Sequence, residues 1–169
     1  MKLRCITQPL TQPVSVEEAK SFCRILGDDD NMIISLLIDA ATDYAQNVTS
    51  RQLCTAKYEV VVGGKESPLL LPKAPLKAIT SVTCNGVELD YSLHYDYDVA
   101  FIEFLATDDV TITYECGYDV VPKSIQAWCL NKVSTLYENR EGIVLGLSVA
   151  EVPSGMIDCI LDHYKVRYL

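Results

Sequence analysis

The chain has 169 residues, 49% of them hydrophobic and 22% charged, a composition that fits a globular protein and excludes an intrinsically disordered one. Its formal net charge of −9 excludes a protein that holds DNA by clustered basic residues. No apolar run approaches the ~18 residues of a membrane span, and the N-terminus lacks a signal-peptide core. We therefore expect no membrane partner and a single domain over residues 1–169.

The N-terminal part predicts two helices. Ser15 and Glu18 form an S-x-x-E capping box for a first helix, which Gly27 should end. A second helix is expected from Met32 to Arg51. Its buried stripe is predicted to contain Ile33, Leu37, Ala40, Ala41, Tyr44 and Val48, and Ile34 and Ile38 are expected to widen it. We interpret the acidic turn at residues 28–30 as a helix N-cap, because the spacing and the distal glutamate of a calcium loop are absent.

Between Leu53 and Cys116 the hydrophobic period changes from 3.6 to 2, which predicts strands. Asn85-Gly86 is a strong signal for a hairpin turn. A second hairpin is expected from Ala100–Leu105 and Val110–Cys116. We read these segments as a small, mostly antiparallel sheet inserted between two pairs of helices.

The stretch from Ile112 to Glu141 joins a strand to a helix. Gly117 can take the positive φ that turns the chain out of the sheet, and Pro122 suits the first helical turn. A last helix is expected to begin at Pro153-Ser154. The predicted fold class is α+β, mainly a helical bundle of about four helices. Helices are expected within residues 15–52, 122–140 and 153–169, with a β insert over 53–116 between the second and third helices.

The sequence contains no pattern that predicts catalysis. Phosphate-binding loops, metalloprotease motifs and nucleophile elbows are absent, and the two histidines, His94 and His163, have no nucleophile at a recognisable spacing. The seven cysteines lack metal-ligand spacing, so we expect no metal, no cofactor and no enzyme activity. The tyrosine-rich segment 91–98 is either a recognition surface or an ordinary strand edge.

Three motifs carry a resemblance to a known family. The first is Gly117-Tyr118 with Val121-Pro122, followed at the end of the helix by Tyr137-Glu138-Asn139-Arg140-Glu141. The others are the opening segment 13–20, PVSVEEAK, and the segment 70–82, LLPKAPLKAITSV. In this order they resemble the head–tail connector (adaptor) proteins of long-tailed bacteriophages and related prophages.

The resemblance implies a structural protein of virion assembly. Connectors form a ring, typically of twelve copies in the virion, beneath the portal protein at the head–tail junction. The ring extends the DNA channel and receives the neck or tail-completion proteins; DNA passes through it without specific binding. Such a protein is made in the host cytoplasm and ends in the virion. Family members use their C-terminal region to attach to the portal, so the segment 153–169 is the expected docking segment. Its candidate residues are Ile157, Ile160, Leu161, Tyr164, Val166, Arg167 and Tyr168.

Contacts within the ring or to the neck are expected where the third helix ends. A charged helix end there runs into a segment with several aliphatic residues, and a soluble monomer seldom leaves such residues without a partner. The candidate residues are Tyr137, Glu138, Arg140, Glu141, Ile143, Val144 and Leu145. The alternative hypothesis is a small-molecule-binding or enzymatic α+β domain that uses the tyrosine-rich insert as a pocket.

Overall fold

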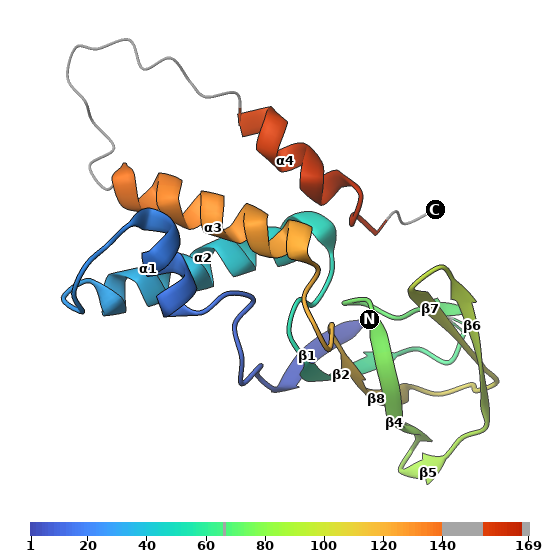
Figure 1. Ribbon diagram of the computed structural model, residues 1–169. Helices are drawn as coiled ribbons and strands as arrows, with labels where there is room; N and C mark the ends of the chain where they lie inside the picture. The colour runs from blue at the N-terminus through green and yellow to red at the C-terminus, as the bar shows by residue number, and fades with distance from the viewer. Residues whose placement is uncertain (66, 140–153, 167–169) are drawn as a thin grey trace. The chain divides into compact units, whose positions relative to one another are not determined.

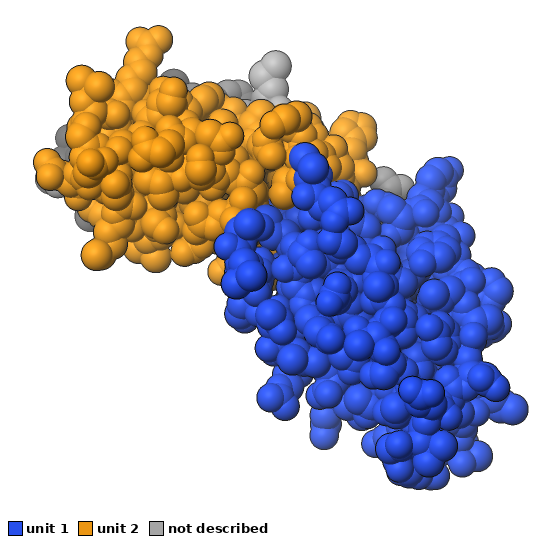
Figure 2. Space-filling view, turned by 60° about the horizontal axis from the view of Figure 1, so that its bottom comes forward, with its two compact units in different colours: residues 1–11, 50–120, 166–169 blue, residues 12–49, 121–165 orange. Residues whose placement is uncertain are grey.

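The computed structural model describes residues 1–65, 67–139 and 154–166 (Figure 1). The chain divides into two compact units, which Figure 2 colours separately. Unit 1 contains residues 1–11, 50–120 and 166, and unit 2 contains residues 12–49, 121–139 and 154–165 of the described chain. Each unit is thus assembled from segments that are far apart in the sequence.

Unit 1 consists of two antiparallel sheets. The five-stranded sheet has the order β1-β2-β8-β4-β5, formed by Lys2–Thr7, Ala56–Val62, Val110–Cys116, Leu76–Cys84 and Val87–Glu88. The three-stranded sheet has the order β3-β7-β6, formed by Leu69–Leu70, Val99–Phe104 and Tyr91–Asp96. Strand β8 is the last strand in the sequence, yet it lies at the centre of the larger sheet.

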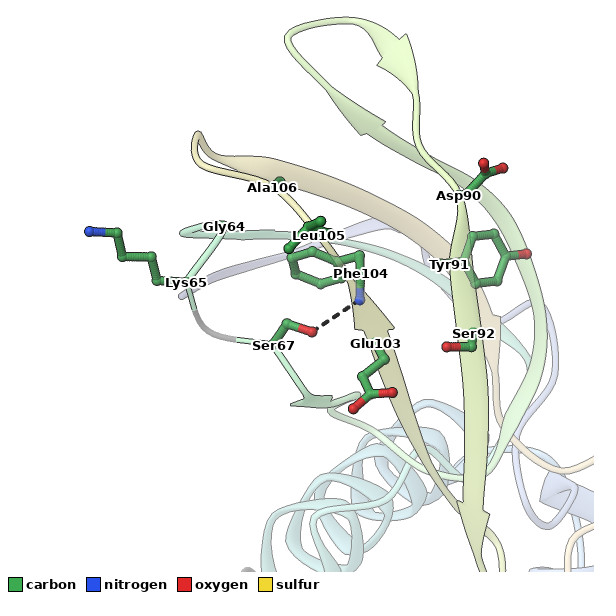
Figure 3. Close-up of a pocket in the computed structure, with 10 residues that line it drawn as sticks. All are labelled: Gly64, Lys65, Ser67, Asp90, Tyr91, Ser92, Glu103, Phe104, Leu105 and Ala106. Carbon is green, nitrogen blue, oxygen red and sulfur yellow. Dashed lines mark hydrogen bonds between the residues drawn. The ribbon is translucent and has the colours of Figure 1, made fainter.

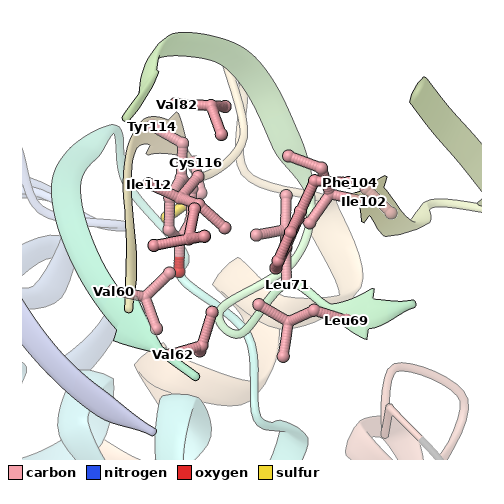
Figure 4. Close-up of a cluster of buried hydrophobic side chains, with 12 residues drawn as sticks. Val60, Val62, Leu69, Leu71, Val82, Ile102, Phe104, Ile112, Tyr114 and Cys116 are labelled. Atoms are coloured by element: carbon pink, nitrogen blue, oxygen red, sulfur yellow. The ribbon is translucent and has the colours of Figure 1, made fainter. Parts of the chain in front are cut away.

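One hydrophobic cluster takes side chains from both sheets (Figure 4). The predicted alternation in β8 is confirmed, since every second residue is fully buried: Val110, Ile112, Tyr114 and Cys116. The hydroxyl of Tyr114 donates to the Pro72 carbonyl at 2.9 Å, and the Tyr114 ring stacks on Tyr58. A buried tyrosine needs such an acceptor, because an unpaired hydroxyl in the core costs about 1–3 kcal/mol.

Two turns follow the expected chemistry. The Asn85-Gly86 turn joins β4 to β5, with φ of +50° and +80°, as the favoured two-residue hairpin turns require. Gly117 has φ +112°, and its N–H donates to the Pro75 carbonyl at 2.9 Å. A Cβ on Gly117 would lie 2.6 Å from the Cys54 carbonyl oxygen, so both the backbone angle and the available space require glycine here.

Unit 2 is helical, with α1 Val16–Cys23, α2 Asn31–Thr49, α3 Lys123–Glu138 and α4 Ser154–Asp162. Trp128 of α3 is fully buried and joins three of these helices. Its ring stacks on Tyr44 of α2 with 5.6 Å between centroids, and its indole N–H donates to Asp158 of α4 at 3.0 Å. Trp128 therefore links α2, α3 and α4 through one side chain.

The predicted capping box at the start of α1 is confirmed. The Ser15 N–H donates to the Glu18 carboxylate at 2.7 Å, and the Glu18 N–H donates to the Ser15 hydroxyl at 3.2 Å. The Ser15 N–H and hydroxyl also hold the pKa of Glu18 below its usual value. The helix ends earlier than predicted, with Arg24 in the left-handed region in place of Gly27.

The prediction of a mainly helical bundle with a small β insert is wrong. The described chain contains eight strands in two antiparallel sheets, and β1 belongs to the larger sheet although it precedes every helix. The predicted hairpin of Ala100–Leu105 with Val110–Cys116 is also wrong, because β7 pairs with β3 and β6 while β8 pairs with β2 and β4. Alternation identifies the buried face of a strand but not the strand beside it.

The predicted stripe of α2 is also partly wrong. The buried residues are Ile34, Ile38, Ala41, Ala45 and Thr49. The first three belong to the predicted stripe or its widening, whereas Ala45 and Thr49 were not predicted. Ile33 is 39% exposed and Tyr44 is 43% exposed. The helix carries apolar residues on two faces, so its period alone did not distinguish them.

Candidate assembly surfaces

The tyrosine-rich segment forms β6 and the turn that follows it. Strand β6 is at the edge of the three-stranded sheet and pairs with β7 on one side. Tyr91, Tyr95 and Tyr97 are 42%, 59% and 97% exposed. On the other face of the sheet, the His94 Nε2 lies 3.3 Å from the Glu103 carboxylate of β7. The segment is thus a strand edge that also presents exposed aromatic rings.

An ion pair fixes the end of the β6–β7 hairpin. The Arg51 guanidinium donates to both carboxylate oxygens of Asp98, at 2.5 and 3.1 Å. The Arg51 side chain is 6% exposed and that of Asp98 is 46% exposed. The bidentate geometry orients Asp98 beside Tyr97, whose φ is +54° in the turn. The ion pair therefore fixes the turn that ends the exposed edge strand β6.

Removing the Asp98 carboxylate should destabilise unit 1. In Asp98→Ala the Arg51 guanidinium stays buried without this acceptor, so we expect the free energy of unfolding to fall by about 1–3 kcal/mol. Urea unfolding followed by circular dichroism measures the change. The exposed neighbour Asp96 is the matched control, and Asp96→Ala should change stability by less than about 0.5 kcal/mol. Equal effects of the two substitutions would contradict this role of the pair.

The β1 edge of the five-stranded sheet is basic. Strand β1 pairs with β2 on one side and exposes Lys2 and Arg4. Leu3 is 38% exposed although it pairs with the fully buried Val60. The pairing becomes irregular between Cys5 and Thr7, so the regular part of this edge is short. Unit 1 thus has one basic and one tyrosine-rich edge.

A hollow of about 740 Å³ lies beside β6 and β7 (Figure 3). Two of the residues that line the hollow are hydrogen-bonded to each other: the Phe104 N–H donates to the Ser67 hydroxyl at 3.0 Å. The charged lining residues Lys65, Asp90 and Glu103 point apart in Figure 3. A small-molecule site requires polar groups that converge on the ligand, so this hollow does not favour the alternative hypothesis.

The buried thiols of Cys54 and Cys116 are poor nucleophiles. Burial raises the pKa of Cys116 to about 12 and also raises the pKa of Cys54, so both stay protonated at neutral pH. Among the described residues no group of three or more His, Cys, Asp or Glu side chains is placed to hold a metal ion. No helix in the described ranges is long and apolar enough to cross a membrane.

Helix α2 exposes an apolar face at its start. Met32, Ile33 and Leu36 are 85%, 39% and 66% exposed and share one side of the first two turns. Exposed apolar side chains that cluster on one face are typical of a protein–protein contact. Unit 2 therefore has a candidate contact surface on the second helix.

Several candidate docking residues of the C-terminal segment are buried or half-buried within the chain itself. Leu161 is fully buried and Ile160 is half-buried. Tyr164 is half-buried, and its hydroxyl lies 2.7 Å from the hydroxyl of Ser124 on α3. Val166 is half-buried and belongs to unit 1. The side chain of Ile157, together with Arg167 and Tyr168, lies outside the described residues.

The candidate ring or neck contacts begin at the end of α3. The hydroxyl of Tyr137 donates to the Asp30 carboxylate, which joins the end of α3 to the chain just before α2. Glu138 is exposed and accepts a hydrogen bond from the Ser134 hydroxyl at 3.4 Å. The remaining candidates lie outside the described residues: Arg140, Glu141, Ile143, Val144 and Leu145.

Residues 13–88 match the family model of the phage gp6-like head–tail connector proteins. Over residues 13–88, a little under half of the chain, the sequence is thus that of a head–tail connector. The resemblance carried by the three sequence motifs is confirmed, and two of those motifs, at residues 13–20 and 70–82, lie inside the matched range. No curated protein matches this connector.

Solved structures share the connector's fold over its whole length. A chain from the neck of an empty GTA particle, computed with C6 symmetry, has a TM-score of 0.79 and 16% identity. A chain from the virion of a native gene transfer agent particle has a TM-score of 0.77 and 18% identity. A chain from the neck of a native GTA particle, computed with C12 symmetry, has a TM-score of 0.71 and 16% identity. Each match covers 100% of this chain and 98% of the other.

Sequence reasoning missed the strand edge at β1, because no strand was predicted before the first helix. For the segment 91–98 a strand edge was one of the two alternatives. A signal was present, because the short segment with Lys2 and Arg4 is basic whereas the segment around β6 contains Asp90 and Asp96. The exposed face at the start of α2 was missed because Ile33 was placed in the core.

Proposed function

We propose that this connector is a structural subunit of a ring at the head–tail junction of a virion, beneath the portal protein. The ring, of twelve copies in the virion, extends the DNA channel and joins the head to the neck or tail-completion proteins. One observation carries the proposal: the whole chain has the fold of chains from particle necks computed with C6 and C12 symmetry. The family match over residues 13–88 points the same way.

The role we propose is structural and not enzymatic. The thiols of Cys54 and Cys116 are protonated, and the charged residues around the hollow at β6 do not converge. A subunit of a ring needs instead two different surfaces, one for each neighbour. The helices over residues 15–52 and 122–140 are our candidates for the ring wall, and the exposed start of α2 suits a neighbour there.

The negative charge suits a channel through which DNA moves. Each subunit carries −9, and the charges add around a ring. A wall that holds DNA needs clustered lysine and arginine, whereas a repulsive wall lets the duplex pass. We infer that DNA passes through this ring without specific binding.

We assign attachment to the portal to the segment 153–169, as the family resemblance implies. In this arrangement the buried Leu161 and the Tyr164–Ser124 contact hold the base of the segment on unit 2. The remaining residues of the segment, 166–169, are our candidates for the contact with the portal. The polar end of α3 and the segment after it are assigned to ring or neck contacts.

Native mass measurement tests the ring. The purified chain is measured alone and mixed with portal rings, and we expect a species of about twelve times the 18.8 kDa subunit mass, at least on the portal. Deleting residues 166–169 should abolish binding to the portal, whereas His163→Ala, at an exposed position of the same segment, should not. A chain that stays monomeric and does not bind the portal would overturn the proposal.

A further inference from the structure

Four strands of unit 1 lie at the edge of a sheet, and two of them, β1 and β6, are longer than two residues. Strand β1 ends the five-stranded sheet and β6 ends the three-stranded sheet, and no described strand pairs with their outer sides. Each strand has six residues and contains no proline. In Figure 1 the two strands lie toward opposite sides of this unit. Open edges are templates for pairing with another chain.

The backbone groups on the open side of β6 can be assigned. The Ala100 carbonyl accepts from the Leu71 N–H at 2.9 Å, and the Phe104 N–H donates to the Ser67 hydroxyl at 3.0 Å, so both residues direct their groups away from β6. Two residues that face each other in an antiparallel pair either exchange both backbone hydrogen bonds or both direct their N–H and C=O groups away from the partner strand. Tyr95 and Tyr91, which oppose Ala100 and Phe104, therefore direct their N–H and C=O to the open edge.

The same alternation assigns the open side of β1. The Val82 carbonyl accepts from the Leu89 N–H at 3.0 Å and so points away from β8. Ile112, opposite Val82, then directs its groups toward β2, and Val60, opposite Ile112, directs its groups toward β8. Leu3, opposite Val60, is left with its N–H and C=O toward the open edge.

The side chains of these residues also share a face. Leu3 opposes the core residue Val60, and Tyr95 opposes the core residue Ala100, so both side chains lie on the core side of their sheets. Leu3 is 38% exposed and Tyr95 is 59% exposed, because each strand is at an edge. Both edges thus present backbone groups together with half-exposed side chains that extend the core.

The opposite face of each edge is charged, with opposite signs. Lys2 and Arg4 occupy this face of β1 and are exposed. Asp96 occupies it on β6 and is exposed, and Glu103 lies on the same face of β7. Neither Lys2 nor Arg4 forms an ion pair with another described residue.

We propose that β1 of one copy adds to β6 of a second copy as an antiparallel strand, with Leu3 opposite Tyr95. This register pairs the outward backbone groups, places Leu3 on the exposed tyrosine ring and sets Lys2 opposite Asp96. Arg4 then lies opposite His94 and close to Glu103. The inference rests on the proposed ring and names the contact that closes it.

The charges also select the geometry of assembly. Pairing β1 with β1 would bring Lys2 and Arg4 of two copies together, and pairing β6 with β6 would bring acidic residues together. Only the mixed pairing joins opposite charges. Because its two surfaces differ, each copy retains one open edge of each kind, and the assembly grows head to tail until it closes. The edges therefore favour a ring over a two-fold dimer.

A charge swap tests the pairing. Lys2→Glu with Arg4→Glu, and separately Asp96→Lys with Glu103→Lys, should each abolish the ring mass of the purified chain or of the chain assembled on portal rings. All four substitutions in one chain should restore the ring, because the edges are again complementary. Rings that survive each single-edge reversal overturn the proposal, as does a four-fold variant that folds by circular dichroism but stays monomeric.

Crosslinking tests the register. In a background with Cys5, Cys23, Cys84 and Cys159 replaced by serine, Leu3→Cys with Tyr95→Cys should give a ladder of disulfide-linked multimers on oxidation. Arg4→Cys with Tyr95→Cys is the control and should give no ladder, because its thiols lie on opposite faces. A ring on the portal without the ladder overturns the strand pairing and leaves the proposed function intact. A chain that forms no ring in any state overturns both.

Discussion

Gly117→Ala should destabilise the connector by at least about 3 kcal/mol. Alanine does not readily adopt φ of +112°, and its Cβ would lie 2.6 Å from the carbonyl oxygen and 2.9 Å from the N atom of the segment Cys54-Thr55. These contacts are backbone atoms, which cannot rotate aside as a flexible side chain does. Urea unfolding followed by circular dichroism of the strands measures the loss.

Gly86→Ala is the matched control for this prediction. Gly86 also has a positive φ, +80°, but a Cβ there would meet nothing within 4 Å. Only the backbone strain remains, so we expect a loss of about 1 kcal/mol. If the two glycines respond equally, the close approach of the Cys54 backbone does not contribute to the requirement for glycine at position 117.

Trp128→Ala should lower the free energy of unfolding by about 3–5 kcal/mol. The side chain is fully buried, stacks on Tyr44 and donates to Asp158, so alanine leaves a cavity and an unpaired acceptor between α2, α3 and α4. Thermal unfolding followed by circular dichroism measures the effect, since the single tryptophan is lost as a fluorophore.

Two further variants separate packing from hydrogen bonding at this position. Trp128→Phe retains much of the packing but loses the indole N–H, and Asp158→Ala removes the acceptor while leaving the ring. Each should cost about 1–3 kcal/mol, less than the alanine substitution of the tryptophan. Asp158→Ala as damaging as Trp128→Ala would show that the hydrogen bond, and not the buried ring, holds α4.

Local patterns predicted much of the secondary structure. The S-x-x-E box at Ser15, the Asn85-Gly86 turn and the positive φ of Gly117 depend on neighbouring residues, and all three are confirmed. The alternation in β8 also follows from the sequence, because a strand with one buried face must repeat every two residues.

The arrangement of the strands did not follow from such patterns. The short connection between Phe104 and Val110 favoured a hairpin, but the two strands belong to different sheets. Which strand lies beside another is decided by packing across the whole unit. For the same reason the edge at β1 was not predicted, since a strand edge is defined by the absence of a neighbour and not by its own residues.

The order of strands in the larger sheet has a consequence for synthesis. Strands β1 and β2 form one pair, β4 and β5 form another, and β8 lies between the two pairs. An isolated two-stranded pair is marginally stable in water. During translation these pairs leave the ribosome before Val110–Cys116, so neither can be completed by its central neighbour until most of the chain has been made. A ribosome that stalls before β8 would therefore expose two half-sheets, each a substrate for chaperones and proteases.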